Sequence, residues 1–327
     1  MSSTNPLISS ITIYVGLPIF ISGTLGNIVD VRLLWRTRRN PCAFIFIVSS
    51  FVNCIVLFYG LFTRILSVGF HLDWSTTNHI WCKTRVALTQ SSFLISLTCI
   101  CLASIDRFLV SCRQEKYRKL SRLSIAIFAV IITNIFWISI FVPYLIYADI
   151  LRNPTTGLFS CTLIRNDAFA IYQNYIGLPI LYGLLPSTTL IITGIMTYRN
   201  TKKLQINRQR ELVQKQLTSM MLIQIPIILL STLPYVIFTE YTILTATVSK
   251  SVDRRAAELL ITNIFTILCY ITFACPFFVF FSTSSSFRQE AKILLLCRKT
   301  NQLRINQIQP YSTTIQRYTR TILMRTN

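Results

Sequence analysis

An acid and a base stand side by side where the third long uncharged stretch ends: Asp106 and Arg107, followed by Phe108. Ionisable groups near a membrane interior are costly, so both groups need partners or water. Adjacent residues point about 100° apart on an α-helix, so one of the two can face the interior of a helix bundle. Two interpretations are open: a pair that meets partners inside the bundle, or interfacial charges whose side chains reach the lipid headgroups.

Seven apolar stretches must position this pair. A helix rises about 1.5 Å per residue and the hydrocarbon core is about 30 Å thick, so a span needs about 20 apolar residues. Hydrophobic residues make up 52% of the chain and charged residues 13%, a balance that disfavours a soluble domain. The sequence therefore predicts an all-α membrane protein, a seven-transmembrane helix bundle. The expected spans are 7–32, 42–63, 86–105, 123–148, 172–198, 216–239 and 257–281.

The positions of the 32 Lys and Arg predict the orientation of the chain, because cytoplasmic loops retain cations during insertion. The three loops on one predicted side of the membrane carry four, six and six cations, and the tail from Arg288, on the same side, carries eight. We expect a multi-pass plasma-membrane protein with the amino terminus outside and the carboxyl terminus in the cytoplasm. The net charge of +21 would suggest nucleic-acid binding in a soluble protein. Here the charges flank apolar spans, so topology and attraction to anionic lipids explain them and nucleic acid is not expected as a partner.

Ten cysteines give a second argument about sidedness. Eight fall within spans or on the inner face, and only Cys82 and Cys161 fall on the predicted outer face. Exposed cysteines in an oxidising compartment usually join, so we expect a disulfide that ties the second outer loop over the bundle. The alternative is two unrelated free thiols.

Landmarks in six of the seven spans together resemble one family. Cys82 precedes Arg107 by 25 residues, and the remaining landmarks are Gly26, Asn27, Trp81, Trp137, Pro186, Leu233, Pro234, Tyr235 and Pro276. This pattern is similar to that of the rhodopsin-like (class A) G-protein-coupled receptors, and nearest in look to orphan invertebrate neuropeptide receptors. The resemblance implies a receptor that binds a ligand outside and activates a heterotrimeric G protein inside.

The resemblance also implies roles for single residues. Arg107 would be held in the resting state and released toward the G protein on activation. Prolines weaken a helix where they remove a hydrogen bond, so Pro186, Pro234 and Pro276 would provide places to bend. The alternative is that proline is simply frequent in membrane helices.

The chain departs from the family pattern in its internal polar cluster. Asn53 replaces the usual acid of span two and Cys275 replaces an asparagine, which places sodium binding in doubt. Asp30 lies one turn after Asn27 on the same helical face, so we hypothesise that it restores a carboxylate to the cluster. The alternative is that Asp30 merely lies near the inner interface. The expected cluster comprises Asn27, Asp30, Asn53, Ser96 and Cys275.

The switch positions differ as well. Thr232 stands where the family has a tryptophan, Val279 and Gly194 replace tyrosines, and Gln214 replaces the acidic partner expected for Arg107. Because an uncharged Gln214 cannot form an ion pair, the sequence predicts measurable ligand-independent signalling. A decoy or an orphan chemosensory receptor of the same fold remains an alternative.

The ligand class follows from the outer half of the spans. Thr89 stands where amine receptors that resemble this family place an aspartate, which disfavours an amine, and span seven has no lysine for a retinal Schiff base. Tyrosines with one or two charges suit a short peptide, because tyrosine supplies contact area and a hydrogen bond together. The alternative is an interfacial tyrosine belt that touches lipid. The candidate pocket residues are Arg85, Thr89, Gln90, Tyr175, Tyr182, Tyr235 and Glu240.

An amphipathic helix is expected from Ser284 to Leu296, with Phe287, Ala291, Leu294 and Leu295 on one face. Such a helix would lie on the inner leaflet. Cys297 is a palmitoylation candidate or a free thiol. The tail is either a phosphorylated site that recruits arrestin or a disordered basic segment. We expect a seven-transmembrane receptor domain over 1–283, the helix over 284–297 and the tail over 298–327.

Catalytic and transport functions find little support. Both histidines lie in the first outer loop, and the chain shows no metal-ligand spacing, phosphate loop or nucleophile motif, so neither a metal site nor an enzyme is expected. A seven-span transporter is the remaining alternative of another class. Transporters usually show paired repeats and charges at the midplane, and only Asp30 would fit that pattern here.

Overall fold

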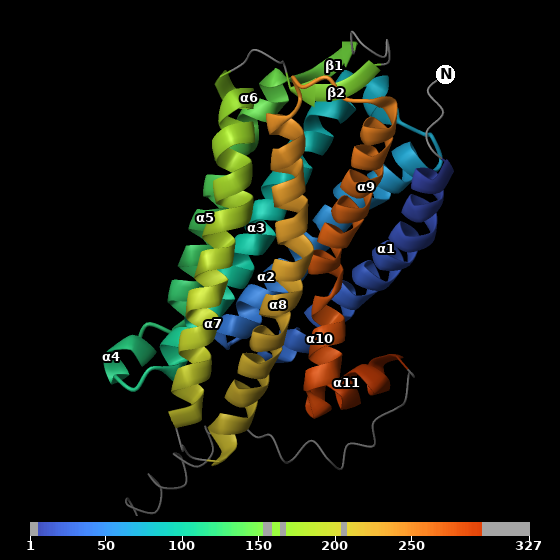
Figure 1. Ribbon diagram of the computed structural model, residues 1–327. Coiled ribbons are helices and arrows are strands. Elements are labelled where there is room, and N and C mark those ends of the chain that lie inside the picture. The colour runs from blue at the N-terminus through green and yellow to red at the C-terminus, as the bar shows by residue number, and fades with distance from the viewer. Residues whose placement is uncertain (1–5, 153–158, 164–167, 204–207, 296–327) are drawn as a thin grey trace, which may run out of the picture. The chain divides into compact units, whose positions relative to one another are not determined.

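Seven helices that are long and apolar enough to cross a membrane dominate the structure, as the sequence predicts (Figure 1). The computed structural model describes residues 6–152, 159–163, 168–203 and 208–295. Two compact units divide the chain, 1–288 and 289–327, and the helix bundle belongs to the first. The seven spans are Pro6–Thr37, Pro41–Gly69, His79–Ser111, Leu123–Tyr147, Gln173–Thr201, Gln216–Leu244 and Val252–Ala274.

Several spans are built from more than one helical segment. The first three comprise α1 (Pro6–Leu34) with η1 (Trp35–Thr37), α2 (Pro41–Val56) with the π-helical η2 (Leu57–Phe62) and η3 (Ile65–Gly69), and α3 (His79–Ser111) preceded by η4 (Trp74–Thr76). The next two are α5 (Leu123–Tyr147), which follows the short α4 (Glu115–Arg118), and the π-helical η5 (Gln173–Leu184) with α7 (Leu185–Lys203), which follow α6 (Ala168–Tyr172). The last are α8 (Arg208–Leu244), α9 (Val252–Ala274) and α10 (Pro276–Thr283), and α11 (Ser285–Leu295) follows them.

Polar side chains begin the helices that follow tight loops. The Asn40 side chain accepts a hydrogen bond from the Cys42 amide at 3.1 Å, and Pro41 occupies the first helical position of α2. Asn78 caps α3 in the same way, accepting from the Trp81 amide at 3.0 Å. Such caps satisfy amides that have no partner within the helix and typically stabilise it by about 1 kcal/mol.

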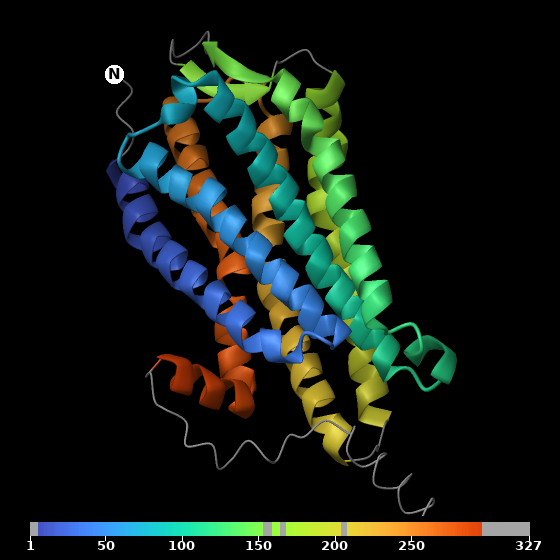
Figure 2. The same ribbon diagram turned by 180° about the vertical axis from the view of Figure 1, so that it is seen from behind.

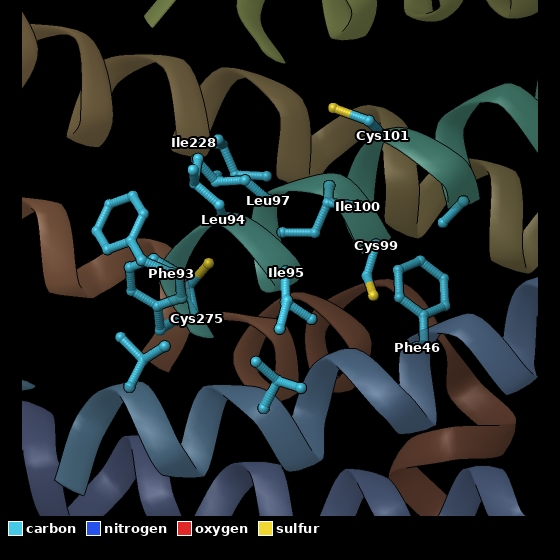
Figure 3. Packing of buried hydrophobic residues seen from close by; sticks show 14 of the residues in the cluster. Phe46, Phe93, Leu94, Ile95, Leu97, Cys99, Ile100, Cys101, Ile228 and Cys275 are labelled. Carbon is cyan, nitrogen blue, oxygen red and sulfur yellow. The ribbon is translucent and has the colours of Figure 1, made fainter. Parts of the chain in front are cut away.

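Helix α3 is the centre of the bundle. It packs against α2, α5 and α7, and in Figure 2 it runs (teal) between α2 (blue) and α5 (green). Figure 3 shows its buried side chains from Phe93 to Cys101 directed toward several neighbours, with Phe46 and Ile228 facing them from α2 and α8. Because every side of α3 is covered in this region, its polar residues meet partners on several other spans.

Two glycines let the first and seventh spans approach closely. A Cβ atom at Gly23 would lie 2.6 Å from the Cβ of Ala274, and one at Gly26 would lie 2.7 Å from the Cβ of Phe277. Only glycine leaves room for these contacts. The close approach brings the Asn27 amide 2.8 Å from the Phe273 carbonyl oxygen, to which it donates.

A disulfide and a two-stranded hairpin mark one end of the bundle, which we call the disulfide end. Strands β1 (Ala148–Arg152) and β2 (Phe159–Leu163) pair antiparallel, with Ile150 opposite Cys161. Cys161 is bonded to Cys82 at the start of α3, with 5.7 Å between the two Cα atoms. The predicted bridge is therefore confirmed.

The hairpin is also held by a polar contact. The Nδ1 atom of His79 lies 2.6 Å from the Asp149 carboxylate. This hydrogen bond holds the pKa of Asp149 below its ordinary value. A carboxyl group whose pKa falls on folding stabilises the fold above its unfolded-state pKa and loses this effect as the pH falls through the folded-state pKa, so the contact operates at neutral pH.

The second and third spans extend further toward the disulfide end than hydropathy alone predicts. The second reaches Gly69 instead of 63, and the third begins at His79 instead of 86. As a result Arg64 and Arg85, expected outside the spans or at their ends, lie within helical segments. Charged residues lower the hydropathy of a window. The predicted second span therefore ends before Arg64, and the predicted third span begins after Arg85.

The expected short eighth helix is present as α11. Ring contacts join Phe287, in its first turn, to Phe277 and Phe280. The hydroxyl of Ser284 accepts a hydrogen bond from the Phe287 amide at 3.1 Å and so caps the helix.

Candidate functional site

Asp106 and Arg107 form a buried ion pair at the end of the bundle opposite the disulfide, which we call the Arg107 end. Nη2 of Arg107 lies 2.5 Å from Oδ2 of Asp106, and the two side chains are 1% and 8% exposed. The second carboxylate oxygen accepts a hydrogen bond from the Ser121 hydroxyl at 2.5 Å. Arg107 also reaches Oδ1 of Asn40 at 3.5 Å, whereas Phe108 is only partly buried. The pair is thus held inside the protein rather than extended to the headgroups.

The expected polar cluster is only partly joined by hydrogen bonds. Asn53 donates from Nδ2 to Oδ1 of Asn27 at 3.1 Å, and the Ser96 hydroxyl donates to Oδ1 of Asn53. This chain links the first three spans. Cys275 lies outside it, because its thiol bonds to the Thr272 carbonyl oxygen of its own helix.

Asp30 stands apart from this chain. Its side chain is 0% exposed, and neither carboxylate oxygen has a hydrogen-bond partner among the described residues. The structure therefore brings Asn27, Asn53 and Ser96 together, whereas the Asp30 carboxylate has no hydrogen-bond partner within the described ranges.

Replacing Asp30 by asparagine is expected to stabilise the purified protein. An unpaired buried carboxylate costs several kcal/mol, whereas an asparagine of nearly equal shape carries no charge. We expect the thermal unfolding midpoint in lipid nanodiscs to rise by several degrees. The matched control is Asn27→Asp, which adds a carboxylate among bonded amides and should lower the midpoint. A lower midpoint for Asp30→Asn would mean that the carboxylate has a stabilising partner, and a sodium-dependent midpoint lost in the variant would identify it.

The three candidate hinge prolines occupy different positions. Pro186 is the second residue of α7, directly after the π-helical η5. Pro234 lies inside the continuous helix α8, and Pro276 begins α10 after the helix breaks at Cys275. Proline removes one hydrogen bond at each place, so all three are weak points of their spans.

Thr232 takes part in a contact between α8 and α9. Its hydroxyl lies 3.1 Å from the Thr272 hydroxyl, which in turn lies 2.6 Å from the Ser231 hydroxyl. Three hydroxyls therefore join the two helices where the family pattern has a tryptophan. Ser231 and Thr272 were not singled out from the sequence, since single hydroxyl residues in spans are common.

The pocket candidates fall into separate groups at the disulfide half. The Tyr182 hydroxyl donates to Oε1 of Gln90 at 2.6 Å and is buried. Thr89 and Tyr235 are partly buried, and a buried oxygen of Glu240 has no hydrogen-bond partner in the described structure. Tyr175, by contrast, is 52% exposed on η5 and is not gathered with the others.

Arg85 lines, together with Thr63, a small hollow that is open to the surface. Its Nε atom donates to the Thr63 hydroxyl at 2.9 Å, and its Nη1 atom donates to the Ser75 hydroxyl at 3.3 Å. The other residues of the wall are Leu66, Leu72, Asp73, Trp74 and Trp81. The wall thus combines apolar and aromatic side chains with one cation and one acid.

A second polar group at the disulfide end was missed from the sequence. The Glu258 carboxylate binds Nζ of Lys250 at 2.6 Å and Nε of Arg254 at 3.1 Å. It also accepts a hydrogen bond from the Tyr241 hydroxyl at 3.0 Å. These contacts tie the end of α8 to the start of α9. The i,i+4 spacing of Arg254 and Glu258 predicts their ion pair from the sequence, but the contact of Glu258 with Tyr241 on α8 is not visible there.

Two candidate residues cannot be placed. Cys297 lies outside the described residues, and so does the side chain of Gln214. No group of three or more His, Cys, Asp or Glu that could hold a metal ion occurs within the described part of the chain.

Comparison with models of protein families shows which family the chain resembles. A family model described as 7 transmembrane receptor (rhodopsin family) matches residues 26–276. No curated protein matches the chain. The matched range contains all seven spans in part or in full, together with the ion pair and the pocket candidates.

Proposed function

Because the chain belongs to the rhodopsin family of seven-transmembrane receptors and is not an enzyme, we propose that it binds an extracellular ligand and activates a heterotrimeric G protein. The observation that carries this proposal is the separation of two sites along α3. A hollow with polar groups lies at the disulfide end, and the buried Asp106–Arg107 pair lies at the other end. A ligand that favours one arrangement of the spans can then change the environment of the pair.

The proposed orientation places the disulfide end outside the cell. Disulfides form in oxidising compartments, and the loops at the Arg107 end carry most of the cations. Epitope tags at the two termini test this orientation. On intact cells only the amino-terminal tag should bind antibody, and equal access to both tags would exclude seven crossings with the proposed sidedness.

We propose a short peptide as the ligand. Aromatic and polar side chains on the disulfide half support this ligand class. They are Tyr182, which bonds to Gln90, and Tyr235 and Glu240. One buried oxygen of Glu240 has no hydrogen-bond partner among the described residues and can accept from an N–H group. A backbone amide of a peptide donates to such a carboxylate oxygen of Glu240, whereas a purely apolar ligand leaves it unpaired. The alternative of a decoy receptor predicts binding of a ligand without nucleotide exchange.

A peptide-library screen on cells that express the chain with a promiscuous G protein tests the proposal. We expect some peptides to raise the second-messenger signal above that of empty cells. Purified protein should then accelerate nucleotide exchange on the G protein, and vesicles should show no peptide flux. Flux without exchange would favour a transporter, and binding without exchange would favour a decoy.

The segment after the last span completes the proposed arrangement. We propose that α11 lies on the inner leaflet, that Cys297 is palmitoylated and that the tail over 298–327 engages arrestin when phosphorylated. The buried Phe287 and exposed Lys292 in α11 support an amphipathic helix. Mass spectrometry of the protein from cells, with and without hydroxylamine, tests the acylation.

A further inference from the structure

Arg64 is a cation inside the second span that the function proposed so far does not use. It lies between the two π-helical segments, about 8 Å along the helix from the last residue of the span. Its Nη2 atom donates to Oδ1 of Asn263 on α9 at 2.9 Å. The Asn263 amide donates in turn to the Thr12 hydroxyl at 3.0 Å. The guanidinium group is therefore fixed toward the bundle interior between three spans.

The contacts of Arg64 do not satisfy its charge. Its Nε atom is buried and has no hydrogen-bond partner among the described residues. Asn263 offers an amide oxygen, which carries no net charge. A charged side chain inside a span without a counter-ion is costly and usually marks a substrate or ion site.

Arg85 places a second cation against the same turn of helix. It donates to the hydroxyl of Thr63, the residue next to Arg64. The hydrogen bond holds the Arg85 guanidinium group at the residue adjacent to Arg64. Like charges repel, so this placement needs a compensating group between or beside them.

The ion pairs of the described structure do not supply that group. None of the ion pairs formed by described residues includes Arg64 or Arg85. Asp73 lies in the wall of the Arg85 hollow, but its carboxylate accepts from the Ser75 amide and hydroxyl instead. Two further acids at this end are engaged elsewhere: Glu258 is bound to two cations, and Asp149 lies against His79.

We propose that the ligand carries an oxyanion, a carboxylate or its equivalent, that binds between Arg64 and Arg85. The inference rests on the proposed receptor function and narrows its ligand class. The planar guanidinium group binds a carboxylate with two parallel hydrogen bonds, which makes arginine suited to this recognition. The carboxylate belongs either to a small organic acid or to a peptide with a free carboxyl terminus or an acidic side chain. An amidated peptide without an acidic residue does not meet the requirement.

Glutarate, with glutaramide as its uncharged analogue, probes the site directly. The purified full chain in nanodiscs is titrated with each at constant ionic strength while its thermal midpoint is followed. Glutarate should raise the midpoint and glutaramide should not. Arg64→Gln keeps a donor for Asn263 but removes the charge, and should weaken glutarate binding about tenfold or more, since a charge-assisted hydrogen bond contributes about 1.5–3 kcal/mol.

Two further variants separate charge from folding. Arg64→Lys keeps the charge without the planar fork and should bind glutarate with intermediate affinity. Arg255→Gln removes an exposed cation near the start of α9 and should bind like the unchanged protein. Equal effects of glutarate and glutaramide, no effect of glutarate, or unchanged binding by Arg64→Gln would each overturn the proposal.

A paired screen distinguishes this inference from the proposed function. Peptide libraries with free and with amidated carboxyl termini, and a set of small organic acids, are compared by nucleotide exchange on the G protein. Activation by the free peptides or by the acids supports the oxyanion site and identifies its source. Activation only by amidated peptides that lack acidic residues overturns the site but leaves the receptor function intact. Glutarate binding with no activation by any member supports the site and counts against G-protein signalling.

Discussion

Replacing Cys82 or Cys161 by serine is expected to abolish ligand binding and to leave little folded protein at the cell surface. The bond joins residues that are 79 positions apart, and Cys82 is 0% exposed at the start of the central helix α3. A disulfide that closes a loop of this length typically contributes about 2–4 kcal/mol. Folded proteins are stable by only about 5–15 kcal/mol, so this loss is a large fraction of the total. Thermal midpoints and the monodisperse fraction after purification measure it.

Cys112→Ser provides the matched control. Cys112 is a free, partly buried cysteine just beyond the other end of α3, so its replacement changes a thiol without cutting a cross-link. It should leave the midpoint within about a degree of the unchanged protein, as substitutions away from special features usually do. The double variant Cys82→Ser, Cys161→Ser should resemble either single variant. Equal midpoints for the unchanged and the double variant would show that the hairpin is held by its other contacts.

The number of spans could be predicted because the bilayer imposes a length and an apolarity that are local properties of the chain. Their ends could not be predicted equally well. Arg64 and Arg85 interrupt the apolar windows, yet both lie within helices because Asn263, Thr63 and Ser75 on other segments accept their hydrogen bonds. These partners depend on packing between distant segments, which hydropathy does not contain.

The polar cluster shows the same limit at the level of single residues. Helical periodicity places Asn27 and Asp30 on one face of α1, but it does not decide which of them meets the second span. Asn27 bonds to Asn53, while the buried Asp30 side chain meets no hydrogen-bond partner in the part of the chain that the structure describes. Register between helices decides this, and Gly23 and Gly26 set how closely α1 approaches α9 and α10. The Cys82–Cys161 bond, in contrast, was predictable from sidedness alone, because only two cysteines fall on that face.

Asp106→Asn is expected to raise ligand-independent nucleotide exchange at least tenfold. Arg107 is 1% exposed and its ion pair in the described structure is with Asp106. Removing one partner of a buried pair typically costs about 3–5 kcal/mol, because the other charge stays buried after its opposite charge is lost. The cost falls on the conformation that buries Arg107, so arrangements in which Arg107 reaches water or a G protein become relatively more populated. A shift of about 1.4 kcal/mol is enough for a tenfold change.

The effect should be larger here than in a receptor with an acid on the sixth span, because Gln214 offers no second charge to hold Arg107. Basal exchange by the unchanged protein should for the same reason exceed that of empty membranes.

Glu115→Gln is the matched control, since it removes a carboxylate from an exposed pair with Lys119 on the neighbouring short helix α4. Exposed pairs contribute about 0–1 kcal/mol, so this variant should not change basal exchange. If Asp106→Asn and Glu115→Gln gave the same basal rate, the buried pair would be a structural contact and not the element that the ligand controls.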